Sequence, residues 1–267
     1  MADFPPTVLT PPEAEEVYEC TGLWLSRQLE NRPIWGVHHN GWQWEFTRLL
    51  VRRWLAREPV AEHPRTFVRE HLSDLSWLPN SELHWLSGIP NEVKTELATE
   101  LTVVLLRMGE QLDLGNDNRP IRIGLDNPTQ QIGPLTLTAD DVDFQLGEHQ
   151  SDGAGAWPGT VLIGLVGDQP TQRDLDRLGF SAVMHALDTG CPPARIVAYG
   201  LFSGQKLHQD VEADWLRNRV GHILSTVSEI TEFNNFRVIR LTPGHHCFGC
   251  TEQRDCPEFD PEDGDLW

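Results

Sequence analysis

The sequence predicts an α/β fold in one integrated domain with three consecutive parts. Helical periodicity dominates residues 1–112. Short β-rich segments alternate with helices over 113–241, and three cysteines mark the tail at 242–267. We therefore expect a helical N-terminal cap on a mixed sheet flanked by helices. A chain of 267 residues is long enough to bury a sizeable hydrophobic core in such a fold.

The N-terminal part is predicted to form a series of helices behind an extended, proline-rich arm at residues 1–12. From Pro11 onward, acidic residues in the first turn precede apolar residues at helical spacing. Shorter helices are expected within 66–88, and a long helix follows a start signal at Pro90. The segment 41–58 is a strong amphipathic candidate, with apolar residues at Phe46, Leu49, Leu50 and Trp54.

The core is predicted to contain strands and helices in the order β-β-β-α-β-α. Four segments rich in Val, Ile, Leu, Thr and Phe are bounded by turn residues. A helix that ends at Gly190 is expected between the last two of them, and another amphipathic helix follows at 210–233. A final short strand is expected directly before the cysteines, at 236–244. The four strand segments are 119–127, 133–146, 159–168 and 194–204.

The formal net charge of −19 disfavours nucleic acid as a partner of the isolated chain, because DNA attracts proteins mainly through Lys and Arg. Lysine occurs only at Lys94 and Lys206. One helix carries the only dense basic stretch, which is more typical of an ion-paired face. Its members are Arg48, Arg52, Arg53 and Arg57.

Apolar runs in this chain are shorter than the roughly 18 residues that a membrane span requires. The first residues also lack the basic and apolar regions of a secretory signal. We therefore expect a cytoplasmic protein without a membrane partner. Clustered cysteines in that reducing compartment bind metal more often than they form disulfides.

Three of the five cysteines form a C-x2-C-x5-C motif at Cys247, Cys250 and Cys256. Two thiolates in a C-x2-C turn can reach the same metal, and four thiolates are the usual requirement of a cubane iron–sulfur cluster. The fourth ligand must then be Cys20 or Cys191. Zinc held by two or three of the motif cysteines with His245 or His246 is the alternative.

The segment LTPGHHCFGCTEQRDCP (241–257) resembles the end of the RecB-like nuclease domains of the PD-(D/E)XK superfamily. These include the CRISPR-associated RecB-like exonucleases and the AddB-type nucleases. EEVYECTGLWLSRQLE (15–30) is similar to the helix that carries their distant cysteine, and 178–204 is similar to the helix–turn–strand that follows their catalytic strand. The resemblance implies a restriction-endonuclease-like mixed sheet, closed by a [4Fe–4S] staple. Its implied ligands are Cys20, Cys247, Cys250 and Cys256.

The same resemblance implies a Mg²⁺ site made from one carboxylate and a following D/E-x-K strand. Asp141 or Asp143 could supply the first carboxylate, but closely spaced acids more often mark a solvated strand end. On the next strand Gly164 falls where the second acid belongs, and Val166 falls where the lysine belongs. The uncharged run 161–166 is typical of a buried central strand. A conventional nuclease site is therefore not expected.

Other positions of the family pattern are also altered. Ser181 and His185 stand where the family has Q-x3-Y, and Glu45 stands where a histidine is often found. The literal E-x-K of Glu92 and Lys94 lies on the first turn of a helix, where residues two apart do not face one site.

Two functions remain as hypotheses. The first is a nuclease-inactive iron–sulfur protein that acts as a structural or regulatory subunit in DNA repair, recombination or defence, through a protein partner. The second is an active Mg²⁺-dependent DNA exonuclease with a rearranged site on Asp141, Asp143 and Asp168. The direction in which these carboxylates point distinguishes the two.

Overall fold

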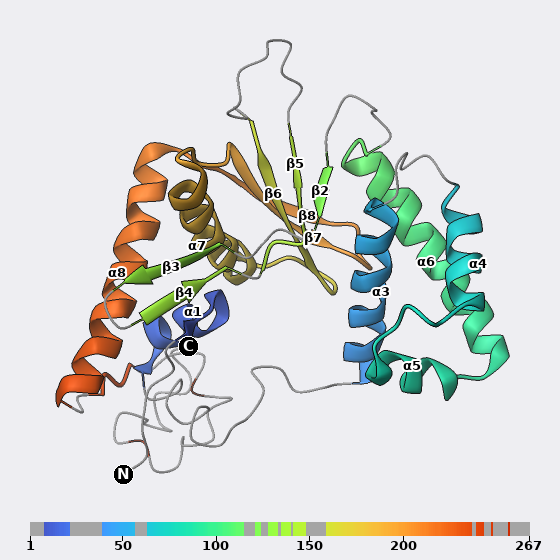
Figure 1. The fold of residues 1–267 in the computed structure, drawn as a ribbon, viewed down its shortest axis with the longest axis horizontal. Coiled ribbons are helices and arrows are strands. Elements are labelled where there is room, and N and C mark those ends of the chain that lie inside the picture. Colours follow the sequence, from blue (N-terminus) through green and yellow to red (C-terminus); the bar gives the residue numbers. More distant parts are fainter. Residues whose placement is uncertain are drawn as a thin grey trace, which may run out of the picture.

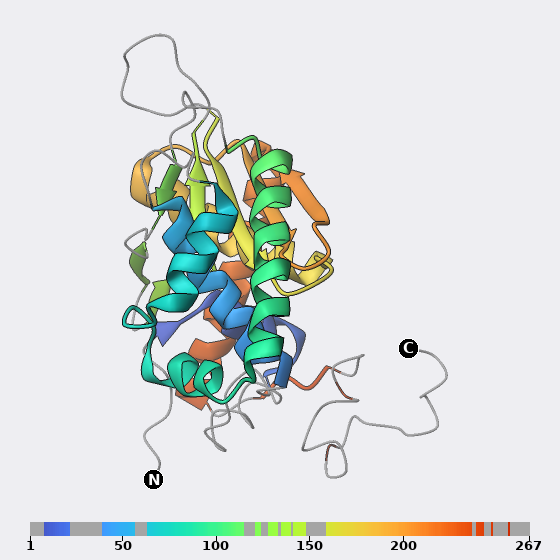
Figure 2. The ribbon, with the colours of Figure 1, turned by 90° about the vertical axis from the view of Figure 1, so that its right-hand side faces the viewer.

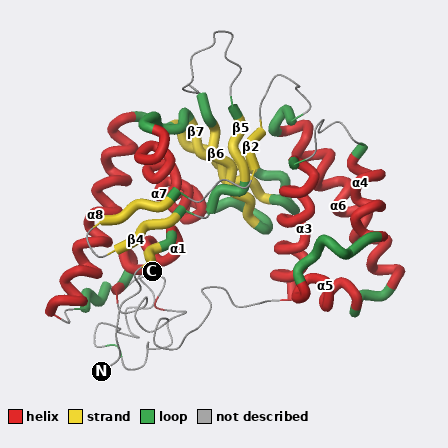
Figure 3. Tube along the Cα trace, viewed as in Figure 1, coloured by secondary structure: helices red, strands yellow, loops and turns green. Residues whose placement is uncertain are grey.

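The computed structural model is a mixed α/β fold with a five-stranded and a three-stranded sheet (Figure 1). Helices flank both sides of the larger sheet (Figure 3). Cys250, His245 and His246 lie outside the described residues. The structure describes residues 8–21, 39–56, 63–114, 121–123, 128–132, 135–139, 141–147, 159–236 and 239–242, together with Cys247 and Cys256.

The described part of the N-terminal region is largely helical, as predicted, but it begins with a short strand that the sequence did not indicate. Strand β1 lies in the expected extended arm and pairs with β4 of the core. The elements are β1 (Val8–Leu9), α1 (Pro11–Glu19), α3 (His39–Leu55), α4 (Pro64–Ser73), α5 (Asn80–Ser87) and α6 (Asn91–Gln111).

The large sheet has the strand order β2-β5-β6-β7-β8. Its pairs are antiparallel except β6–β7, which are parallel and are connected through α7. Strand β6 is central and its first five residues are buried, as its uncharged sequence predicts. The core elements are β2 (Ile121–Ile123), β5 (Phe144–Leu146), β6 (Val161–Val166), α7 (Gln172–Thr189), β7 (Arg195–Gly200), β8 (Lys206–Asp210) and α8 (Ala213–Phe236).

The predicted strand at 133–146 is in fact two strands in two different sheets. Its first half, β4 (Leu135–Thr138), pairs with β3 (Thr129–Ile132) and β1 in the small sheet. Its second half enters the large sheet as β5. The prediction of one continuous strand was wrong because both halves contain strand-forming residues. They pair with different strands and therefore lie in different sheets.

Two further predictions need correction near the C-terminus. Helix α8 continues to Phe236, and the described residues 239–242 are not in a strand, so the expected strand at 236–244 is not observed in the described part of that segment. Strand β8 was missed because Leu207 is the only apolar residue in its sequence. Its side chains alternate between exposed and partly buried, which is typical of an edge strand.

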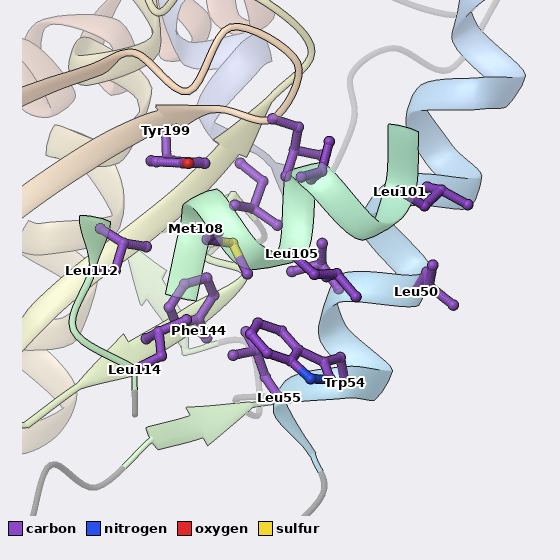
Figure 4. Close-up of a cluster of buried hydrophobic side chains, with 14 of the residues drawn as sticks. Leu50, Trp54, Leu55, Leu101, Leu105, Met108, Leu112, Leu114, Phe144 and Tyr199 are labelled. Carbon is purple, nitrogen blue, oxygen red and sulfur yellow. The ribbon is translucent and has the colours of Figure 1, made fainter. Parts of the chain in front are cut away.

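A hydrophobic core fills the space between the helical layer and the large sheet (Figure 4). Its residues come from α3, α6, β5 and β7, elements that are far apart in the chain. Seen from the side, the long α6 runs the length of this layer (Figure 2). Central members are Leu50, Trp54, Leu101, Leu105, Met108, Phe144 and Tyr199.

The opposite face of the large sheet is covered by α7, and α8 lies outside α7 (Figure 1). A second core joins α7, α8, α1 and the small sheet. Helix α7 ends at Gly190 as predicted, and local sequence signals define both of its ends. Thr171 and Asp174 form a reciprocal capping box at its start, and Gly190 takes a left-handed conformation (φ 74°) at its end.

Among the described residues, no helix is long and apolar enough to cross a membrane.

Candidate functional site

Asp143 is buried directly before β5 and is not part of a solvated strand end. Its side chain is 0% exposed. Oδ1 accepts a hydrogen bond from Arg48 Nε at 2.5 Å, and Oδ2 accepts one from the backbone N–H of Leu165 at 2.8 Å. A buried carboxylate requires such partners, so both oxygens are committed to holding β5, β6 and α3 together. The preference for a solvated acid was wrong at this position.

Arg48 is the functional residue whose role the sequence did not reveal. It reaches Asp143 from α3, and its guanidinium lies over the ring of Trp44, 5.1 Å from the ring centroid. Burial disfavours its charge, but Asp143, followed by Glu45 and Asp141, more than compensates and raises the pKa of Arg48. The basic stretch in the sequence was the available signal, but the stretch alone does not show which arginine turns inward.

Glu45, which stands at the position of the expected histidine, lies close to the Arg48–Asp143 pair. Burial, together with the charges of Asp143 and Glu82, raises the pKa of Glu45 despite the opposing effect of Arg48. Its environment therefore favours the neutral acid more than water does.

The position expected to supply the second carboxylate has no room for a side chain, and the position expected to supply the lysine is an uncharged valine. A Cβ atom on Gly164 would lie 2.8 Å from Leu178 Cδ2 and 3.1 Å from the Asp141 carbonyl oxygen. An aspartate there would collide with the α7 core, and Val166 offers no charge. Asp141 is partly exposed and Asp168 is exposed in the loop after β6.

The described residues therefore do not fit the Mg²⁺ that the family resemblance implies. No group of three His, Cys, Asp or Glu side chains among them could hold a metal ion. Of the acids in the rearranged-site hypothesis, Asp143 already has both carboxylate oxygens engaged, one by Arg48 and one by the N–H of Leu165.

Both lysines lie away from Asp143. Lys94 is on the first turn of α6, as expected for a helix start, and Lys206 Nζ donates to the carbonyl oxygen of Gln111 at 3.4 Å. Of the residues at the Q-x3-Y positions, Ser181 is buried, and the ring Nδ1 of His185 is 3.4 Å from Gln145 Nε2. Neither position adds an acid or a base to the surroundings of Asp143.

Cys20 lies at the point where the N-terminal helix meets the segment that leads to the cysteine tail. It is buried just after α1, and its Sγ is 3.9 Å from the carbonyl oxygen of Arg240, 220 residues away. The contact is supported by Glu229 on α8, which accepts from Thr21 Oγ1 at 3.0 Å and from Arg240 Nη1 at 2.6 Å.

The remaining described cysteines are less enclosed. Cys247 and Cys256 are partly exposed. A cysteine outside the ligand set is expected to be a small buried apolar side chain, but Cys191, which follows α7, is partly exposed and does not fit that expectation.

Helix α1, which precedes Cys20, packs through charged groups against α7 and α8. Burial, with a smaller contribution from the nearby Asp176, raises the pKa of Glu15 to about 7 against the opposing charge of Arg219. Arg219 Nη2 pairs with Asp176 at 2.6 Å. Next to them the rings of Tyr18 and His222 stack with centroids 3.8 Å apart.

We predict that Glu15 makes the docking of α1 weaker as the pH rises. Its pKa in the folded protein is above its ordinary value of 4.5, so its contribution is complete below pH 4.5 and is lost as the pH rises through about 7. The difference between the two pKa values corresponds to at most about 3 kcal/mol of stability. Partial exposure of Glu15 to solvent reduces this figure. Glu15→Gln should therefore stabilise the protein at pH 8 but not at pH 4.5, as measured by urea unfolding at both values.

Glu232→Gln, on the exposed face of α8, is the matched control and should have little effect at either pH. Burial lowers the pKa of His222, which gives the opposite pH dependence. The quantity compared at each pH is therefore the difference in unfolding free energy between variant and wild type, because both proteins contain His222. An equal difference at both pH values would contradict the role of Glu15.

No family model and no curated protein matches this chain. Among solved structures, one described as "Crystal structure of SSO0001" is similar at 11% sequence identity, with a TM-score of 0.31, over 81% of this chain and 96% of the other.

Proposed function

We propose that this protein is a RecB-like protein of the PD-(D/E)XK superfamily that binds an iron–sulfur cluster and has no nuclease activity. It would act as a structural or regulatory subunit in DNA repair, recombination or defence, through a protein partner. The observation that most directly supports the absence of nuclease activity is the Arg48–Asp143 pair, because Arg48 already binds the carboxylate that was the first candidate metal ligand. The packing of Leu178 against Gly164 adds to it.

The proposed cluster is a [4Fe–4S] centre bound by Cys20, Cys247, Cys250 and Cys256. Support comes from the C-x2-C-x5-C spacing and from the proximity of Cys20 to Arg240, which brings the distant cysteine to the beginning of the tail segment. Such a cluster would contribute a cross-link between α1 and the tail. Zinc bound with His245 or His246 is the alternative, and elemental analysis separates the two metals.

We predict no Mg²⁺- or Mn²⁺-dependent cleavage of single- or double-stranded DNA by the purified protein. The reason is that the described residues do not form a divalent-metal site beside Asp143. End-labelled DNA incubated with the protein should remain equally intact in the presence of Mg²⁺, Mn²⁺ or EDTA.

The informative variant in this assay is Asp141→Asn, because Asp141 is partly exposed and is not the partner of Arg48 at the buried pair. Metal-dependent cleavage that this substitution abolishes would favour the rearranged exonuclease and would contradict the proposal. Asp214→Asn, an exposed substitution on α8, controls for the change in net charge.

A further inference from the structure

An open groove with a cavity volume of about 660 Å³ lies between α3, α6 and the loops that follow β6 and β7. It is at the carboxyl ends of the parallel pair β6–β7, the edge where α/β sheets most often bind ligands. The residues that line it include Trp44, Glu100, Val103, Arg107, Asp168 and Phe202. None of them belongs to the cysteine motif or to the Arg48–Asp143 pair.

Three glycines allow the walls of this groove to approach one another. A Cβ on Gly167 would lie 3.0 Å from Trp44, and one on Gly204 would lie 2.2 Å from the Arg107 side chain. A Cβ on Gly200 would lie 1.8 Å from the Asp168 carbonyl oxygen. A side chain at Gly200 would collide with backbone, Gly204 has the left-handed φ of 69° that favours glycine, and a side chain at Gly167 would displace the Trp44 ring. The shape of the groove therefore depends on these three positions.

The groove combines apolar walls with two carboxylates. Trp44, Val103 and Phe202 provide apolar surface, and Val103 is 44% exposed. Glu100 is exposed and accepts a hydrogen bond from Gln43 across the groove at 3.1 Å. The Asp168 carboxylate is exposed and has no side-chain partner among the described residues.

Among the described residues that line the groove, the one cation, Arg107, is already engaged in the structure. Arg107 Nη1 donates to the carbonyl oxygen of Phe202 at 2.9 Å, and the side chain packs on Gly204. The two carboxylates therefore outnumber it, on a chain whose formal net charge is −19. An anion such as a nucleotide would meet repulsion, whereas a cation would be attracted.

We propose that this groove binds a basic side chain, arginine or lysine, from an extended segment of a partner protein. Such side chains have an aliphatic stem for the walls formed by Trp44, Val103 and Phe202, and a cationic head for Asp168 and Glu100. The indole N–H of Trp44 is buried in this wall and has no hydrogen-bond partner among the described residues, so its NMR signal can report on occupancy of the groove without being a contact of the ligand. The volume exceeds one side chain, so it accommodates the neighbouring residues of the segment.

This inference rests on the proposed action through a protein partner and names the chemistry of that partner. It is independent of the cluster, which shares no residue with the groove, and of the Asp141→Asn nuclease assay, because Asp141 does not line the groove. Binding could therefore be lost while the protein still holds iron and remains inactive on DNA, or the reverse.

The experiment uses the full-length protein and two blocked pentapeptides of alanine, one with a central arginine and one with citrulline, its neutral isostere. Binding is followed by ¹H–¹⁵N NMR at the indole N–H of Trp44, which Trp44→Phe assigns. We expect saturable shifts with the arginine peptide, at least fivefold weaker binding of the citrulline peptide, and weakening by added salt.

Asp168→Asn should reduce the affinity for the arginine peptide about five- to tenfold, since it removes the charge from one charge-assisted contact. It keeps the backbone oxygen that accepts from Ser203 Oγ at 2.8 Å. Asp214→Asn makes the same charge change on α8, where Asp214 pairs with Arg217, and should leave the affinity unchanged.

Equal binding of the arginine and citrulline peptides would overturn the proposal, as would equal effects of the two Asp→Asn variants. Tighter binding of uridine monophosphate than of the arginine peptide would show that the groove serves an anion. A dimer in sedimentation that Asp168→Asn disperses would show that a second copy of this chain occupies the groove. Either result would also contradict a basic segment of a partner protein.

Discussion

Replacing Arg48 by methionine should lower the free energy of unfolding by about 3–5 kcal/mol. The substitution keeps much of the apolar stem but removes the cation that Asp143 contacts at 2.5 Å. Asp143 is 0% exposed and would retain only the N–H of Leu165 as a partner. An uncompensated buried charge of this kind costs much more than a lost surface pair. Urea unfolding of wild type and variant at pH 7 measures the difference.

The double variant Arg48→Met, Asp143→Asn tests the origin of this loss. Asparagine can still accept from Leu165 but carries no charge, so the double variant should recover most of the lost stability. Arg217→Met is the matched control, because Arg217 and Asp214 also pair at 2.6 Å but are 74% and 82% exposed. It should cost less than about 1 kcal/mol. Equal losses in Arg48→Met and Arg217→Met would contradict the structural role of the buried pair.

Loss of the proposed cluster should have an effect of similar size. Cys20 and Arg240 lie 220 residues apart in the sequence, so a cluster ligated at Cys20 and in the tail would close a very long loop. On the chain-entropy model used for disulfides, such a cross-link contributes on the order of 5 kcal/mol, against a typical domain stability of about 5–15 kcal/mol. Cys20→Ser should therefore reduce iron content and lower the melting temperature by about 10 °C.

Cys191→Ser is the control, since Cys191 is partly exposed and is not among the proposed ligands. Anaerobically purified wild type and Cys191→Ser should each contain about four iron atoms and four sulfides per chain. Removing iron from wild type by chelation should lower its melting temperature to that of Cys20→Ser, which separates the cluster from packing effects of the substitution. Stoichiometric zinc without iron, or an unchanged melting temperature after chelation, would contradict the proposal.

The Arg48→Met and Cys20→Ser experiments test two different connections within the molecule. The Arg48–Asp143 pair joins the helical layer to the large sheet, and the Cys20 region joins α1 to the end of α8 and the tail segment.

The sequence by itself determined the features that depend on neighbouring residues. Periodicity and local start and stop signals gave the helices α3, α6, α7 and α8, and the uncharged run gave the buried β6. The sequence also showed directly that glycine and valine stand at positions 164 and 166, where a nuclease site would need an acid and a lysine. Each of these properties is contained in a short window of the chain.

Only the tertiary structure decided how distant residues meet. Asp143 has the same sequence signature as a solvated acid, yet it is buried because Arg48, 95 residues earlier, packs beside it. The two halves of 133–146 both form strands, but pairing with different partners places them in different sheets. The groove beside Asp168 exists because two loops and two helices converge on three glycines. Burial and charge pairing depend on packing between elements, and no local window of sequence contains that information.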